Sequence, residues 1–169
     1  MMHNYRVTKY NPCYRDEKGS FLKDEWISVG DIGRLYNGEI FKFSEYLQYE
    51  NAYISAVRLA MKANNVGSFQ IVKVGKNDPI GFPDISILTV AEYIDLIKDK
   101  HIINYSNVDF CIRLILREML WGILESPDMF VHFGYDYYMY IGSRVDLTFE
   151  STLLSELGLF VEEMPSSYI

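Results

Sequence analysis

The chain has 169 residues, a formal net charge of −7 and an apolar fraction of 49%. This length suffices for one domain with a substantial buried core. The negative charge argues against direct binding of nucleic acid, which requires a basic surface. Tyr is frequent, with 14 copies, and its amphipathic ring suits either a strand or a contact surface.

The negative charge is concentrated in the C-terminal third. From Glu118 to the end, nine acidic residues accompany one basic residue, Arg144, so this third has a net charge of −8. Through Ala60, eight acidic residues balance eight basic ones. A negative field of this kind would speed the encounter with a basic partner. A solvated surface that keeps the protein soluble is the alternative explanation.

No segment is typical of a signal peptide or a membrane span. The N-terminus has no long apolar stretch, and the longest one, Phe110–Leu124, is interrupted by three charged residues. The sequence therefore predicts a cytoplasmic protein that does not bind membranes. Cys13 and Cys111 are far apart and form no CxxC pair, so no disulfide framework is expected, and Cys111 should be buried.

The first part of the chain predicts a strand and a long loop. Residues 5–10 alternate in the β manner, and 11–20 form a polar loop with Pro and Gly. Residues 26–29 suggest a short strand and 31–36 a helical turn.

The first long helix is predicted from Ser44, the N-cap candidate, to about Asn64–Asn65. Its apolar residues recur at spacings of three and four and should form one buried stripe. They are Tyr46, Tyr49, Tyr53, Val57 and Ala60. A strand over 68–74 and a loop over 76–84 follow.

Two further helices are predicted in the middle of the chain. Thr89 and Glu92 have the spacing of a capping box that opens a helix to about Lys98. Ser106 should cap the longest helix, which runs to Glu125. That helix is apolar nearly all round and should lie in the core, with three buried side chains in particular. These are Leu114, Met119 and Trp121.

The C-terminal part predicts a β-hairpin over 129–143, in which two aromatic runs flank a turn at 134–136. A helix over 151–157 and a strand over 159–163 complete the chain. Helices and strands are mixed without a regular βαβ rhythm. The sequence thus predicts a single α+β domain, with a mostly antiparallel sheet packed against two or three helices.

Motifs for nucleotide binding, nucleophilic catalysis or metal binding are not visible in the sequence, so we expect no catalytic site, metal or cofactor. His132 is the one residue to weigh, because Asp136 lies four positions later, on the same face of an extended strand. A structural His within an aromatic sheet is the favoured interpretation. Arg113 and Arg117 could bind an anion, but Asp109 and Glu118 are expected to neutralise them.

Three stretches together carry a resemblance to a known class of proteins. They are HNYRVTKYNPCYRDEKGSFLKDEWISVGDIG, VHFGYDYYMYIGSRVDL and ELGLFVEEMPSSYI. The combination resembles small bacterial immunity proteins of polymorphic or contact-dependent toxin systems. The resemblance implies a cytoplasmic antidote that binds a toxin domain, often a nuclease, and blocks it. It carries no functional residues across, because no catalytic motif is associated with that group.

The sequence therefore predicts a non-enzymatic protein that binds a toxin domain with a basic surface. We expect the contact at the hairpin tip, extended by nearby acidic residues. The candidates are Tyr135, Asp136, Tyr138, Glu125, Asp128, Glu162 and Glu163. Two other functions stay open: a small enzyme that uses His132 with hydroxyl groups of the hairpin, and a structural protein that associates with itself.

Overall fold

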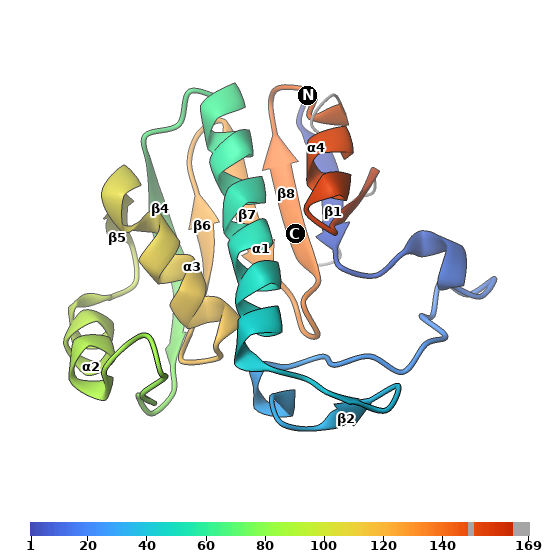
Figure 1. Cartoon of the computed structure of the whole chain (residues 1–169). Coiled ribbons are helices and arrows are strands. Elements are labelled where there is room, and N and C mark those ends of the chain that lie inside the picture. The colour runs from blue at the N-terminus through green and yellow to red at the C-terminus, as the bar shows by residue number, and fades with distance from the viewer. Residues whose placement is uncertain (149–150, 164–169) are drawn as a thin grey trace.

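The computed structural model describes residues 1–148 and 151–163, which form a seven-stranded sheet (Figure 1). The strands follow the order β5-β4-β6-β7-β8-β1-β9, and every neighbouring pair is antiparallel. Their bounds are β1 His3–Thr8, β4 Ser68–Lys76, β5 His101–Asn104, β6 Leu120–Glu125, β7 Met129–Phe133, β8 Met139–Ser143 and β9 Phe160–Glu163. The predicted α+β fold with an antiparallel sheet is confirmed.

Helices cover one face of this sheet. Figure 1 shows α1, α3 and α4 on the same side, with α1 crossing the middle strands. The helices are α1 Phe43–Ala63, α2 Ile87–Leu96, α3 Val108–Leu116 and α4 Ser151–Glu156. The core between helices and sheet is apolar and aromatic, and Cys111 is buried there as expected.

The stripe predicted for the first long helix faces this core. Tyr46, Tyr53 and Val57 are completely buried, which is the free-energy reason for the helix to lie on the sheet. Its N-cap lies two residues before the predicted one. Lys42 is the N-cap, and its backbone N–H donates to the Glu45 side chain at 2.8 Å, so Ser44 is already inside the helix.

The predicted helix from Ser106 to Glu125 is wrong. The α-helix ends at Leu116, and β6 begins at Leu120. The backbone N–H of Met119 donates to the carbonyl of Leu114 at 3.0 Å, and that of Glu118 donates to Ile115 at 3.0 Å. This is a Schellman motif, and the left-handed residue it requires is Glu118, with φ of 63°. Because Glu stands where Gly is usual, the sequence contains no visible stop signal.

The break changes the position of Trp121. This side chain was expected in the core, but it is 43% exposed, because alternation along β6 turns it to the face away from the helices. Leu114 and Met119 are buried as predicted. The apolar run thus serves two consecutive buried elements, a helix and a strand, rather than one long helix.

Three smaller predictions are also wrong. Residues 26–29 form no strand, and the expected turn at 31–36 is replaced by a 3-10 helix, Val29–Asp31, and the two-stranded sheet of β2 and β3. Their bounds are β2 Leu35–Tyr36 and β3 Glu39–Ile40. Ser86, not Thr89, caps α2, because the Ser86 hydroxyl accepts from the backbone N–H of Thr89 at 3.1 Å. β5 was not predicted.

The arginines of α3 pair differently from the prediction. The Nε of Arg117 donates to Glu50 at 2.7 Å, and its Nη1 donates to Asp84 at 2.8 Å. The side chains of Arg117 and Glu50 are both completely buried. Arg113 also donates to Glu50, at 2.8 Å. The network joins α1, the end of α3 and the loop before α2, and it leaves Glu118 free to face solvent.

Candidate functional site

The hairpin between β7 and β8 turns through residues 134–138 and projects Tyr135 into solvent. The backbone N–H of Gly134 donates to the Tyr138 carbonyl at 2.7 Å, and that of Tyr138 donates to the Tyr135 carbonyl at 3.1 Å. Asp136 and Tyr137 both have positive φ, of 57° and 64°. Tyr135 is 82% exposed and Asp136 is exposed, so the predicted exposed tip is confirmed.

Tyr137 anchors this loop to the core, and sequence reasoning missed it. Its hydroxyl donates to the Leu116 carbonyl at 2.8 Å and lies within hydrogen-bond distance of the Tyr46 hydroxyl, at 3.0 Å. Its own carbonyl accepts from Tyr53 at 2.7 Å. Burial raises the pKa of Tyr137, so the phenol stays protonated and keeps donating. The loop that carries Tyr135 is therefore held rigidly against α1 and the end of α3.

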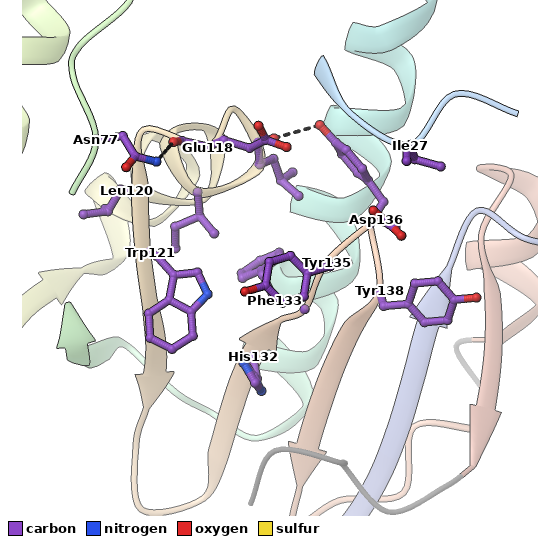
Figure 2. A pocket seen from close by; sticks show the side chains of 14 residues that line it. Ile27, Asn77, Glu118, Leu120, Trp121, His132, Phe133, Tyr135, Asp136 and Tyr138 are labelled. Atoms are coloured by element: carbon purple, nitrogen blue, oxygen red, sulfur yellow. Dashed lines mark hydrogen bonds between the residues drawn. The ribbon is translucent and has the colours of Figure 1, made fainter. Parts of the chain in front are cut away.

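A cavity of about 480 Å³ opens between this hairpin, β6 and the turn that follows α3 (Figure 2). Its size lies within the range of small-ligand pockets. The lining is aromatic and apolar, with a few polar groups. It consists of Ile27, Asn77, Ile115, Leu116, Glu118, Leu120, Trp121, His132, Phe133, Gly134, Tyr135, Asp136, Tyr137 and Tyr138.

The charge of this cavity is one-sided. Among the residues that the structure describes, its lining includes two carboxylates, Glu118 and Asp136, and no Lys or Arg. Both residues are exposed, and neither carboxylate forms an ion pair with another residue in the described part of the chain. The lining also includes Trp121 and Tyr135, and the face of an aromatic ring carries partial negative charge that attracts cations. The cavity is therefore suited to a cation with an apolar stem.

His132 borders the cavity from β7 but is almost completely buried, with 2% exposed. Its ring centroid lies 6.0 Å from that of Trp121 and 6.2 Å from that of Tyr140. Burial lowers the pKa of His132, and Lys73 lowers it further. In Figure 2 its ring points away from Asp136, because the left-handed turn interrupts the alternation that would have placed both on one face.

Tyr138 belongs to a separate cluster on the sheet. Its ring extends away from Trp121 in Figure 2, and its hydroxyl accepts from Arg15 at 2.8 Å. Arg6 pairs with Glu162 at 2.9 Å, and Arg15 lies 3.8 Å from the same carboxylate. Glu162 is thus already neutralised, whereas Glu163 is exposed at the end of β9.

Glu125 and Asp128 lie at the other end of the sheet. They border the turn between β6 and β7, separated from the hairpin tip by the full length of β7. Asp128 also pairs with Arg144 at 2.7 Å. The structure therefore distributes the seven sequence candidates over three places. Tyr135 and Asp136, with Tyr138 at the margin, line the cavity together with two residues that the sequence did not suggest as contacts, Glu118 and Trp121.

In the part of the chain that the structure describes, no group of His, Cys, Asp or Glu side chains could hold a metal ion. None of the helices in this described part is long and apolar enough to cross a membrane. No family model, no curated protein and no solved structure matches the chain.

Proposed function

We propose that this chain is a non-enzymatic immunity protein, a cytoplasmic antidote that binds and blocks a bacterial toxin domain. The observation that carries the proposal is the hairpin tip, where Tyr135 stands 82% exposed beside Asp136 on a loop anchored by Tyr137. A large aromatic side chain on a rigid loop can bury much area in a partner at small entropic cost. Contacts of this kind dominate the energy of protein interfaces.

The charge around the tip supports a basic partner. Glu118 and Asp136 have no cation of their own among the described residues, so a partner can supply one. The resemblance to immunity proteins of toxin systems points to the same kind of partner, because a nuclease toxin needs a basic surface for its substrate. The contact surface in this proposal is narrower than the sequence suggested, since Glu125, Asp128 and Glu162 lie outside it.

Co-expression with a toxin tests the proposal. The partner to use is the C-terminal toxin domain encoded directly upstream, and the readout is growth. We expect the wild-type chain to restore growth and Asp136→Lys to restore it poorly. Asp95→Lys, which makes the same charge change at an exposed position of α2, is the matched control and should protect fully. Growth inhibition that the wild-type chain does not relieve, despite its soluble expression, would contradict the proposal.

The cavity also favours a second candidate, a small enzyme, because His132 borders it together with two carboxylates. A His of lowered pKa could accept a proton there. His132→Gln keeps a polar side chain of similar size, so it tests which of the two functions the protein has. An antidote should retain its protection with this variant, whereas an enzyme that depends on His132 should lose its activity although the protein stays folded.

A further inference from the structure

The chain binds one of its own cations in a way that indicates what the cavity takes. The Nζ of Lys9 lies 4.2 Å from the ring centroid of Tyr10 and 4.3 Å from that of Trp26. It also lies 3.0 Å from a carboxylate oxygen of Glu25, and the Lys9 side chain is 1% exposed. Two aromatic faces and one carboxylate thus hold a desolvated cation.

The cavity at the hairpin contains the same kinds of group, and none of the described Lys or Arg residues lines it. It presents Trp121 and Tyr135 as aromatic surfaces, and Glu118 and Asp136 as carboxylates. Trp121 is 43% exposed, so the indole is open to an incoming group. Lys73 acts electrostatically on His132 from the exposed part of β4, but it does not line the cavity.

We propose that this cavity binds the guanidinium of an arginine presented by a partner protein. The inference rests on the proposed function and specifies how the partner is recognised. Arginine fits better than lysine, because its planar group stacks on an indole and donates to two carboxylates in different directions. Its aliphatic stem matches the apolar side chains in the lining, among them Ile27, Ile115 and Leu120.

Hydrogen bonds hold the backbone of the proposed arginine site in place. Tyr137 ties the hairpin to the end of α3, and Asn77 donates to the carbonyl of Glu118 at 2.7 Å. Both carboxylates are therefore carried by backbone that is held in place before a ligand arrives. Preorganisation of this kind lowers the cost of binding and gives specificity for the charged group.

Nuclear magnetic resonance of the full chain tests the inference with N-acetyl-arginine-amide as the probe. The two indole N–H signals, from Trp26 and Trp121, are assigned with the variant Trp121→Phe. We expect a saturable shift of the Trp121 signal and none of the Trp26 signal, which belongs to the Lys9 site. N-acetyl-citrulline-amide, which has the same shape without the charge, should bind at least about tenfold more weakly.

Variants decide whether the carboxylates do the binding. The double variant Glu118→Gln with Asp136→Asn should bind the arginine probe at least about tenfold more weakly than the wild type does. Asp95→Asn on α2 is the matched control and should leave binding unchanged. Equal binding of the arginine and citrulline probes, or equal binding by the double variant and the wild type, would overturn the inference.

The outcome is separable from that of the proposed function. If the chain protects cells from the toxin but the Trp121 signal does not respond to the arginine probe, the arginine site is wrong and the antidote stands. If the probe binds at Trp121 but no toxin is neutralised, the site stands and the antidote is wrong. A lysine probe that binds more tightly than the arginine probe would also contradict the choice of guanidinium.

Discussion

Single buried side chains determine how α3 is held in the molecule. Leu114 is completely buried beneath the helix, and Arg117 carries its charge into the interior beside the rings of Phe43 and Phe82. A buried charge is tolerated only when partners compensate for its lost hydration. Glu50 and Asp84 provide that compensation for Arg117.

Truncation of Leu114 measures the packing at this position. Leu114→Ala should lower the free energy of unfolding by about 2–5 kcal/mol, because it removes buried methyl groups and leaves a cavity. Leu88→Ala removes the same atoms from a side chain of α2 that is 72% exposed, so it should cost no more than about 0.5 kcal/mol. Urea unfolding of both variants gives the comparison, and similar losses would show that α3 is not a core helix.

Asp84 makes the contribution of the same network to the free energy of unfolding depend on pH. The hydrogen bonds from Arg117 hold the pKa of Asp84 below its ordinary value of 3.8. Because the folded state favours the ionised form, this stabilisation is present above pH 3.8 and is lost as the pH falls through the lower folded-state pKa. Asp84→Asn should therefore cost more free energy of unfolding at pH 7 than at pH 3. An equal cost at both values would show that the Asp84–Arg117 pair does not couple to folding.

At the scale of elements, the β7–β8 pair shows how a glycine sets the packing of a strand. Phe130 lies directly opposite Gly142, and its ring occupies the space that a side chain at Gly142 would need. An added methyl group there would overlap the ring. The aromatic side chain thus covers the glycine of the neighbouring strand and compensates for its missing side chain.

A double-mutant cycle tests this packing. Gly142→Ala should destabilise the protein by about 1–3 kcal/mol, because the Phe130 ring must leave its place. In a Phe130→Ala background the same substitution should cost much less, since the space is then empty. Thermal or urea unfolding of the four proteins gives the coupling. Additive effects would mean that Phe130 does not lie over Gly142 in solution.

At the scale of the whole molecule, the proposed contact combines an aromatic anchor with an acidic surround. The two make different contributions to binding. A desolvated aromatic anchor mainly slows dissociation, whereas exposed charges mainly speed association and make it depend on salt. The position of Tyr135 at the tip, with Asp136 beside it, allows the two effects to be separated by single substitutions.

Binding kinetics with the cognate toxin domain provide the test. Tyr135→Ala should raise the dissociation rate by roughly thirtyfold with little effect on association, as expected for an anchor worth about 2 kcal/mol. Asp136→Lys should lower the association rate and its dependence on salt. Asp95→Lys should change neither rate. Wild-type rates for both hairpin variants, with the fold intact, would place the interface elsewhere.

Elements with a local pattern in the sequence were predictable. The Tyr46–Tyr53–Val57 stripe follows the period of a helix, and the hairpin around Gly134 is marked by aromatic strands on both sides. The antiparallel α+β class followed from these patterns. The break between α3 and β6 was not predictable. An apolar run looks the same in a buried helix and in a buried strand, and Glu118, which adopts the left-handed turn conformation, is not a residue type that indicates a turn.

The composition of the cavity depends on how distant segments pack, and the sequence did not predict it. The exposed tip at Tyr135 was predictable, since turn residues flanked by strands must be at the surface. Glu118 and Trp121 were assigned to a core helix, so nothing in the chain suggested that they would meet the hairpin. Conversely, acidic residues that the sequence analysis placed on one surface lie apart in the structure. The antiparallel pairing of β6, β7 and β8 places Glu125 and the hairpin tip at opposite ends of the sheet. Proximity along the chain gives charge density, but strand direction and pairing decide which charges share a surface.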